Sequence, residues 1–298
     1  MFTAVNTGAV SGAIAIDSSQ PFAKVWKENT LTTIVYLVFS IPAALLLAWT
    51  TTRFGLIGVW AIAIPLLGVR QLHKSTNGLR RVNEELLVLM VKSIEARDPY
   101  TSGHSQRVSR SSEIIARAIG LSPREIERVR IAGLLHDIGK IDASLGAIIT
   151  KPGKLTNEEF AVMQTHPDKG AELVSTITHL QDLVPSIRHH HERWTGGGYP
   201  TGIAGERIPL GARIIAVADT IDAMMSDRAY RTRRTIEEIR DEIVRCRGTQ
   251  FDPVLADCVV DPAVWDAICD GGPPVPGVSR RSSPRLAVVL GNTAVKVG

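Results

Sequence analysis

The sequence predicts an all-α protein in which a pair of uncharged helices and a connecting helix precede a helical domain. Two runs near the N-terminus, residues 31–50 and 54–69, contain no charged residue. Leucines with heptad-like spacing follow from Leu72. Between residues 71 and 270, helix-start signals recur, and no period-two alternation bounded by turn residues is present.

The first 70 residues resemble a lead and two membrane spans. Residues 1–20 have no charged start and no cleavage pattern, so we expect no signal peptide. Residues 1–30 are expected to form a flexible lead. The run 31–50 is long enough to cross a bilayer, whereas 54–69 is slightly short. The alternative is a buried helical hairpin, which the lack of a polar face disfavours. Basic residues flank the pair, so both ends are expected in the cytoplasm.

A connecting helix is predicted over residues 71–91. Leu72, Leu79 and Leu86 are spaced by seven, and Val82 and Leu89 stand at the intervening positions. This pattern is typical of a parallel homodimer seam. An amphipathic helix lying on its own domain explains the spacing equally well.

The helical domain is predicted over residues 92–265. Three capping boxes mark helix starts, each with Ser or Thr followed three residues later by Glu: Ser122-Glu125, Thr156-Glu159 and Thr235-Glu238. Asp252-Pro253 marks another start, and Gly120 and Gly248 are suitable stops. Residues 266–298 are rich in Gly, Pro, Ser and Arg and are expected to be disordered.

Composition excludes several classes of protein. The chain has 298 residues, 44% of them apolar, with a net charge of +4. The ends hold the positive charge, because residues 71–270 carry −2. A groove for a nucleic-acid polymer is therefore not supported. Cys246, Cys258 and Cys269 form no close pair, which argues against a disulfide scaffold or zinc ribbon and favours three small buried side chains.

Histidines and aspartates cluster in short polar motifs of this domain. His136 and Asp137 end an apolar helix, and Asp219 sits in an equally apolar one. Such groups are costly to bury unless they are paired or bind metal. A single buried histidine or aspartate is usually a satisfied core residue. Five histidines with two buried aspartates favour a metal site.

These motifs together resemble the HD-GYP domain, a subset of the HD-superfamily phosphohydrolases that is typical of bacterial cyclic di-GMP phosphodiesterases. The resemblance runs from about residue 92 to 260 and rests on these strings: RDPYTSGHS (97–105), HDIGK (136–140), KPGKL (151–155), THP (165–167), HHE (190–192), GYP (198–200), AD (218–219) and SDR (226–228). The uncharged runs also resemble, more weakly, the last spans of membrane sensor modules.

The resemblance implies an HD-type helical bundle with a dinuclear metal centre. It assigns one metal to His104, His136, Asp137 and Asp219. It assigns the second to His166, His190 and His191, with Asp137 bridging. Carboxylate and imidazole ligands suit iron or manganese, with zinc left open. Two such metals lower the pKa of a shared water and stabilise charge on phosphoryl oxygens. The resemblance gives Asp137 and Lys140 catalytic roles.

The resemblance also implies substrate contacts. Lys140 would reach a phosphate oxygen as a point charge. Arg228 and Arg231 match phosphate-contacting positions, although a solvated basic face is the alternative. Tyr199, in the glycine-rich loop, would stack on a base or simply pack, and the loop would border the site or only connect helices. The same loop would be a contact for diguanylate cyclase (GGDEF) domains.

Two single positions depart from the family pattern. Thr195 replaces the usual Asp or Asn before the loop, which puts its local geometry in doubt. Tyr100 stands where some members have a glutamate and bind a third metal, so two metals are expected. His189, His179 and His73 match no ligand position and are expected to be structural or surface residues.

The sequence therefore predicts a phosphodiesterase anchored in the bacterial inner membrane with a cytoplasmic catalytic domain. It would hydrolyse cyclic di-GMP to linear pGpG, and whether hydrolysis continues to GMP is left open. One alternative is a phosphohydrolase for another cyclic dinucleotide or nucleotide. The other is a catalytically weak receptor or scaffold that binds cyclic di-GMP.

Overall fold

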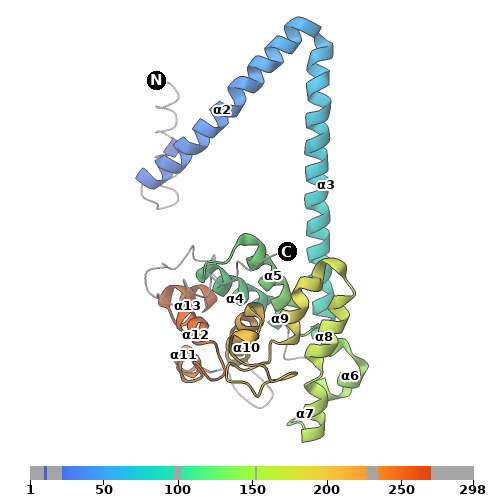
Figure 1. Cartoon of the computed structure of the whole chain (residues 1–298), viewed down its shortest axis with the longest axis vertical. Helices are drawn as coiled ribbons and strands as arrows, with labels where there is room; N and C mark the ends of the chain where they lie inside the picture. The colour runs from blue at the N-terminus through green and yellow to red at the C-terminus, as the bar shows by residue number, and fades with distance from the viewer. Residues whose placement is uncertain (1–9, 12–21, 97–101, 152, 227–233, 270–298) are drawn as a thin grey trace. The chain divides into compact units, whose positions relative to one another are not determined.

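Helices form nearly all of the regular structure in the computed structural model, which describes residues 10–11, 22–96, 102–151, 153–226 and 234–269 (Figure 1). Within these residues the only β-type pairing is an isolated bridge between Arg247 and Phe251. The prediction of an all-α fold is confirmed. Most of the predicted lead and of the predicted C-terminal tail lies outside the described residues.

Two long helices contain the uncharged runs. α2 spans Phe22–Phe54 and α3 spans Leu56–Glu95, and Gly55, with a φ of 59°, stands between them. Pro42 lies inside α2 and Pro65 lies inside α3. The second run and the connecting segment are thus one continuous helix. In the part of the chain that the structure describes, α3 is the one helix that is long and apolar enough to cross a membrane.

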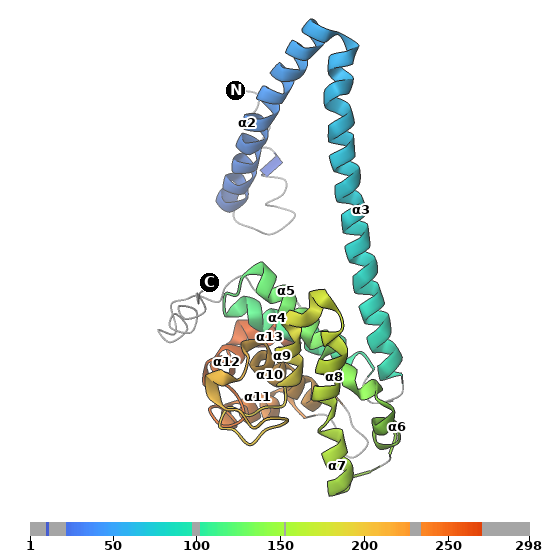
Figure 2. The same cartoon turned by 45° about the vertical axis from the view of Figure 1, so that its right-hand side comes forward.

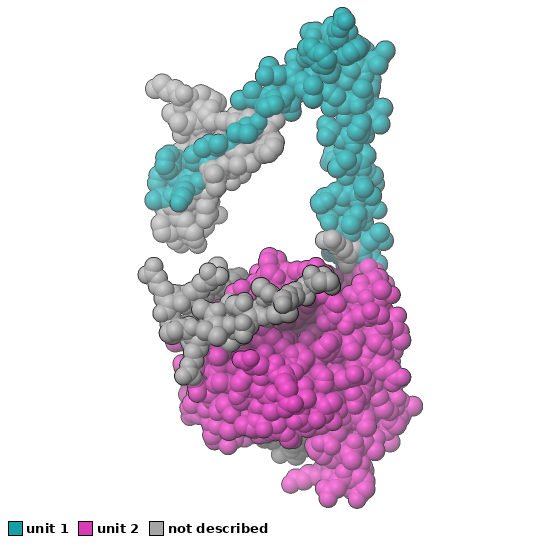
Figure 3. Space-filling model, viewed as in Figure 1, with its two compact units in different colours: residues 1–82 teal, residues 83–298 magenta. Residues whose placement is uncertain are grey.

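The chain divides into two units, Met1–Val82 and Asn83–Gly298 (Figure 3). The predicted seam residues of α3 have exposed side chains: Leu72, Leu79, Val82, Leu86 and Leu89. In the second unit, a different face of α3, formed by Leu87, Val88, Val91 and Ile94, packs against the hydrophobic core. The two explanations of the heptad-like spacing therefore concern different faces of the same helix.

The second unit continues with short helices separated by turns (Figures 1 and 2). The helices are α4 (His104–Ala118), α5 (Pro123–Leu135), α6 (Ala143–Ile149), α7 (Asn157–Met163), α8 (His166–Ser175), α9 (Val184–Arg188), α10 (Leu210–Met225), α11 (Ile236–Arg245), α12 (Pro253–Val259) and α13 (Pro262–Cys269). Three 3-10 segments are η1 (Ile138–Ile141), η2 (Thr178–Leu183) and η3 (Gly205–Arg207).

The predicted helix starts are confirmed. Ser122, Thr156 and Thr235 each form a complete capping box, which starts α5, α7 and α11 respectively. The side chain of Asp252 accepts a hydrogen bond from the Val254 amide at the start of α12. These caps satisfy backbone amides that have no partner inside the helix. Gly120, with a φ of 79°, follows the end of α4 as expected.

α10 is the central helix of this unit. It packs against α4, α5, α9, α11 and α12. Ile214, Ile215 and Val217 of α10 are fully buried. A helix that is apolar on nearly all sides is stable only when neighbours cover it. Any polar residue of α10 that faces inward must therefore have a specific partner, and Asp219 and Asp222 are two such residues.

Candidate metal centre

Five segments distant in sequence, four of which carry histidines, contribute side chains to one polar cluster in the core of the second unit. His104 is the first residue of α4, and His136 follows the last residue of α5. His166 is the first residue of α8, and His190 and His191 lie in the turn after α9. These histidines lie at or next to helix ends, where some backbone N–H and C=O groups have no hydrogen-bond partner within the helix.

The first group of ligand atoms comes from His104, His136 and Asp219, whose potential ligand atoms all lie within 4.8 Å of one another. The distance from His104 Nε2 to Asp219 Oδ1 is 3.3 Å. The two histidine rings meet edge to face with their centroids 5.2 Å apart. The predicted ligands of one metal are therefore brought together.

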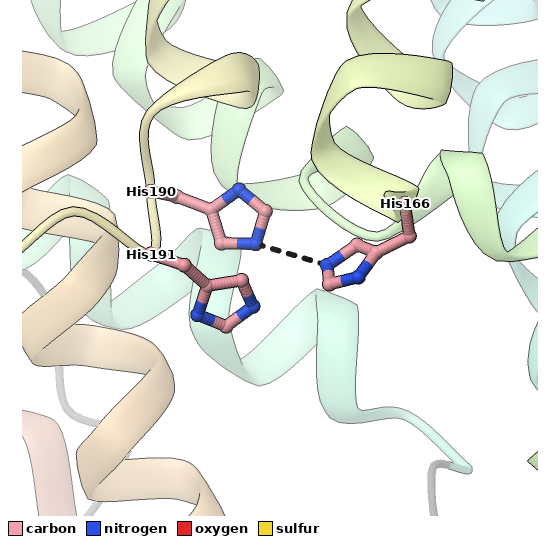
Figure 4. Close-up of side chains that lie close together, drawn as sticks. All are labelled: His166, His190 and His191. Atoms are coloured by element: carbon pink, nitrogen blue, oxygen red, sulfur yellow. Dashed lines mark hydrogen bonds between the residues drawn. The ribbon is translucent and has the colours of Figure 1, made fainter. Parts of the chain in front are cut away.

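The second group consists of His166, His190 and His191, again within 4.8 Å (Figure 4). The Nε2 atoms of His166 and His190 are 3.4 Å apart. The ring of His191 lies beside both, with centroids 4.1 Å from His190 and 5.1 Å from His166. These are the residues predicted to bind the second metal.

Asp137 joins the two groups. Its Oδ1 lies 3.2 Å from Nε2 of His166 in the second group. Its Oδ2 lies 3.4 Å from Nε2 of His136 and 3.8 Å from Nε2 of His104 in the first group. Each carboxylate oxygen thus faces a different group, as a bridging ligand requires.

The backbone fixes the orientation of three histidine rings. The Nδ1 atoms of His136, His166 and His190 each donate a hydrogen bond to the carbonyl oxygen three residues earlier, over 2.7, 2.8 and 2.6 Å respectively. A carbonyl oxygen can only accept, so Nδ1 of each ring carries a proton. In the neutral form of each ring, Nε2 therefore presents a bare lone pair to the centre of the cluster.

His104 is oriented by a side chain instead. Its Nδ1 lies 2.7 Å from Oδ2 of Asp222, one turn after Asp219 on α10. Arg107 holds that carboxylate in turn, with its Nε donating to Oδ1 over 2.6 Å. Metal-binding histidines commonly donate their second ring nitrogen to a carboxylate in this way. The sequence reasoning missed Asp222 and Arg107, although the spacing Asp219-x-x-Asp222 on an apolar helix could have indicated the first.

Burial and neighbouring charges shift the pKa values of several side chains in the cluster. Burial raises the pKa of Asp137, but Lys140 and His136 outweigh burial and hold this pKa well below its usual range. Burial, assisted by neighbouring histidines, lowers the pKa of His190 well below its usual range and that of His191 to about 3. The cluster thus combines an ionised Asp137 with the neutral imidazoles of His190 and His191, as metal binding needs. Burial lowers the pKa of His104, but hydrogen bonds to Asp219 and Asp222 outweigh burial and raise this pKa to about 10, so this ring must lose a proton to bind a metal.

The donor set fits a metal. Nε2 of His136 is buried and has no hydrogen-bond partner, and the lone pairs of His166 and His190 point at each other. Buried polar atoms without partners are rare and need an explanation. A divalent cation on each side of Asp137 would satisfy all of these atoms. Carboxylate and imidazole donors suit iron, manganese or zinc.

Gly139 allows α8 to approach the HD motif. A Cβ atom at this position would lie 2.0 Å from the carbonyl oxygen of His166 and 2.5 Å from the amide nitrogen of Gly170. Because both are backbone atoms, no side-chain movement could relieve such a contact. The glycine of the string HDIGK is therefore needed to bring His166 beside Asp137.

The glycine-rich loop packs back on the histidine turn. The amide of Tyr199 donates to the carbonyl oxygen of His191 over 3.3 Å, and the Tyr199 ring covers the His191 ring with centroids 4.7 Å apart. A Cβ atom on Gly198 would lie 2.5 Å from Cα of Glu192. Burial raises the pKa of Tyr199. Tyr199 therefore packs on a predicted ligand, and stacking on a base stays a prediction.

Glu192 holds the far side of this loop. Its buried Oε1 accepts hydrogen bonds from the amide and hydroxyl of Thr201 and from the amide of Gly202, over 2.8, 2.7 and 3.0 Å. The sequence reasoning quoted Glu192 but gave it no role. Thr195, the departure from the family pattern, donates its hydroxyl to the carbonyl oxygen of Thr249 over 3.0 Å.

The remaining predicted residues have different outcomes. Lys140 lies at the site, with its Nζ donating to Oδ2 of Asp137 over 2.6 Å. Arg228 and Arg231 lie outside the described residues, as does Tyr100. His189 faces Glu192 rather than the metal ligands, with its Nδ1 3.7 Å from Oε1.

Comparison with known proteins identifies the family. Residues 89–255 match the HD domain family. A cyclic di-GMP phosphodiesterase response regulator of Xanthomonas campestris is 39% identical over 193 residues, which are 64% of this chain and 51% of that protein. A 3'3'-cGAMP-specific phosphodiesterase of Vibrio cholerae is 37% identical over 190 residues, which are 63% of this chain and 36% of that protein.

Among solved structures, the crystal structure of a cyclic GMP-AMP-specific phosphodiesterase from V. cholerae has a TM-score of 0.48 and 20% identity, covering 70% of this chain and 53% of that one. The two curated relatives are matched over about a third to a half of their own length. The match to the HD domain family spans more than half of the chain and includes all of the metal-centre residues described above. The chain therefore belongs to the HD domain family.

Proposed function

We propose that this protein is an HD-GYP phosphodiesterase that hydrolyses cyclic di-GMP to linear pGpG. The observation that carries the proposal is the convergence of seven donor side chains into two groups that share Asp137. Relatives named cyclic di-GMP phosphodiesterases support the substrate class. Whether the same centre also converts pGpG to GMP is a question for product analysis.

The residues that would hold the metals are those of the two groups, with Asp137 between them. When bound, two divalent metals supply Lewis acidity toward the phosphoryl oxygens and lower the pKa of a water at the site. The protein contributes fixed imidazole orientations, through the carbonyl contacts of His136, His166 and His190. A preoriented donor set lowers the cost of reorganisation during phosphoryl transfer.

Lys140 would bind the substrate. Its ammonium group lies against Asp137, and its side chain is 23% exposed, so it borders both the cluster and the solvent. A point charge in this place would attract a phosphate oxygen and hold the diester next to the metals. Arg228 and Arg231 stay candidates for the second phosphate.

A different cyclic dinucleotide is the main alternative substrate. Relatives in V. cholerae named 3'3'-cGAMP-specific phosphodiesterases are 32–37% identical to this chain. The proposed metal ligands would act at the phosphate rather than at the bases, so they do not distinguish the two substrates. Substrate choice must depend on residues that contact the bases.

We also propose that α2 and α3 anchor the protein in the inner membrane and that the exposed seam of α3 pairs with a second copy. Large apolar side chains without cover support both parts: Trp49 is 59% exposed in α2, and Leu56 is 75% exposed in α3. The seam residues Leu72, Leu79 and Leu86 are also exposed. Apolar side chains at seven-residue intervals suit a parallel pair of helices. Contact of the glycine-rich loop with GGDEF domains is a further proposal from the resemblance.

A product assay with matched metal analysis tests the enzymatic proposal. The purified full chain is loaded with Mn²⁺ or Fe²⁺ and incubated separately with cyclic di-GMP, 3'3'-cGAMP and cyclic di-AMP. We expect pGpG from the first substrate. Faster hydrolysis of 3'3'-cGAMP would assign the alternative substrate. Tight binding of one ligand without hydrolysis of any would favour a receptor.

The variant His136→Ala/Asp137→Ala tests the mechanism. It removes one donor of the first group and the carboxylate shared by both. We expect the rate to fall about a thousandfold or more, because several kcal/mol of transition-state stabilisation come from the metals. An unchanged rate would refute the assigned centre. His189→Ala is the matched control, because this neighbouring histidine faces Glu192 and should leave the rate unchanged.

A further inference from the structure

Glu95 lies at the junction between the connecting helix and the first metal ligand. It is the last residue of α3 and is 8% exposed. Its Oε2 accepts a hydrogen bond from the backbone amide of Gly103, and its Oε1 accepts one from the amide of Ser105, each over 2.8 Å. One carboxylate therefore holds the two amides on either side of His104.

These contacts take the place of a helix cap. His104 begins α4, and Gly103, in the N-cap position, has no side chain that could accept from the first amides. The amides of a helix start have no partner within the helix, and a carboxylate there is also stabilised by the helix dipole. Glu95 is thus a long-range cap, contributed by α3 rather than by the residues just before α4.

The cap fixes the backbone of a residue whose ring is already fixed. Asp222 of α10 holds Nδ1 of His104, while Glu95 of α3 holds the amides of the residues before and after His104. The other three oriented histidines take their ring contacts from carbonyls of their own segment. Among the described contacts, the support for the position of His104 therefore comes from two other helices.

The end of α3 also borders the cavity at the centre. Val91, Ile94 and Glu95 line this cavity, together with His104 and Asp137. Val91 is 4% exposed and belongs to the hydrophobic core, so this face of α3 is anchored in the domain. A displacement of the last turn of α3 should therefore also displace the Glu95 carboxylate and, through it, His104.

We propose that Glu95 is a positioning residue for the first metal and that it makes occupancy of this metal depend on α3. The inference rests on the proposed metal centre, and not on the identity of the cyclic dinucleotide. Removing the cap should loosen His104 while leaving His166, His190 and His191 in place. The loss should therefore fall on one metal of the two.

Metal binding by the full chain tests this proposal. The metal-free wild type, Glu95→Ala and Glu95→Gln are titrated with Mn²⁺, and the two binding constants and the stoichiometry are measured by calorimetry. We expect Glu95→Ala to weaken one site about 10- to 100-fold, the usual range for a residue that supports a ligand. Glu95→Gln retains one acceptor oxygen and should give an intermediate loss.

Two further variants separate positioning from general stability. Glu113→Ala removes a carboxylate of α4 that pairs with Arg117 on the same helix, and it should leave both constants unchanged. In a His104→Ala background, Glu95→Ala should cause no additional loss of metal affinity. An additional loss there, equal loss at both sites, or unchanged constants in Glu95→Ala would overturn the proposal. These readouts remain decisive even if no cyclic dinucleotide is hydrolysed.

Discussion

The histidines of the proposed metal centre are oriented in two different ways. His136, His166 and His190 each bond to a carbonyl three residues earlier, so a single turn of chain sets the direction of the ring. His104 bonds to Asp222, which is 118 residues later, and its backbone is capped by Glu95 from α3. The first arrangement needs only a correct local turn. The second exists only when α3, α4 and α10 are packed together.

The ligands therefore differ in how strongly their orientation depends on the tertiary structure. A locally oriented ring keeps its direction when neighbouring helices shift, because donor and acceptor move together. A ring held by a distant carboxylate changes its direction with that carboxylate. We therefore expect perturbations of packing to affect His104 before they affect His136, His166 and His190.

The first prediction, with the strongest effect, concerns the close backbone contact between η1 and α8. In Gly139→Ala the new Cβ atom would overlap the backbone of His166 and Gly170, so α8 must move away from Asp137. We expect the free energy of unfolding to fall by about 3 kcal/mol or more, measured by urea denaturation.

Gly146→Ala is the matched control for this substitution. Gly146 lies inside α6, and a Cβ atom there would meet nothing within 4 Å. Alanine should stabilise the helix by up to about 1 kcal/mol. If Gly139→Ala were as harmless as Gly146→Ala, the close approach of η1 and α8 would not hold the second group in place.

The second prediction addresses the orientation of His104 directly. Asp222→Ala removes the acceptor of Nδ1 and leaves Arg107 without its carboxylate. We expect the affinity for one metal to fall about 10- to 100-fold and that for the other to stay the same. The measurement is a Mn²⁺ titration of the metal-free protein.

Asp257→Ala is the control for the carboxylate, because Asp257 is 58% exposed and pairs with Arg247 on the surface. It should change neither binding constant. Equal weakening of both metals by Asp222→Ala would show that the two ligand groups are not separately supported, and the comparison would fail.

The third prediction concerns His191 and the loop that packs on it. Among the described contacts, the His191 ring bonds to neither a carbonyl nor a carboxylate, and it lies against Tyr199. Glu192→Gln weakens the three hydrogen bonds that hold the loop at Thr201 and Gly202. Hydrogen bonds to a charged group contribute about 1.5–3 kcal/mol each, and the amide retains part of this. We expect faster hydrogen exchange at Thr201 and Gly202, and Glu206→Gln, an exposed residue of η3, should not change it.

The smallest expected effect tests the departure at Thr195. Thr195→Val removes the hydroxyl that donates to the carbonyl of Thr249, and Thr195→Ser retains it. One neutral hydrogen bond contributes about 1 kcal/mol to the free energy of unfolding. We expect this loss in the valine variant only, measured by urea denaturation. Equal stability of both variants would mean that another contact holds the loop.

The sequence was sufficient for features that depend on neighbouring residues. The capping boxes at Ser122, Thr156 and Thr235 were predicted because their donors and acceptors are three residues apart. The donor residues could be named from short strings that the resemblance brought together. Their convergence at Asp137 was then found in the structure.

Long-range partners could not be found in this way. The acidic residue that pairs with His104 could have been any of several, and only the packing of α4 on α10 selects Asp222. The role of Glu95 was equally hidden, because the predicted boundary of the connecting helix was residue 91 and the helix continues to Glu95. The apolar patterns gave no reason to expect that α3 has one face in the core and another exposed.

The contact between Gly139 and Gly170 has a consequence for how this centre tolerates sequence change. A Cβ atom on Gly170 would lie 3.1 Å from the amide nitrogen of Gly139, so the two segments touch through their main chains. Main-chain atoms have no rotamers, and their contact distance does not vary with the volume of nearby side chains. The spacing between Asp137 and His166 is therefore set by a main-chain contact, which substitutions of core side chains do not change. Substitutions among the surrounding aliphatic residues should lower the free energy of unfolding well before they alter the distance between the two proposed metal positions.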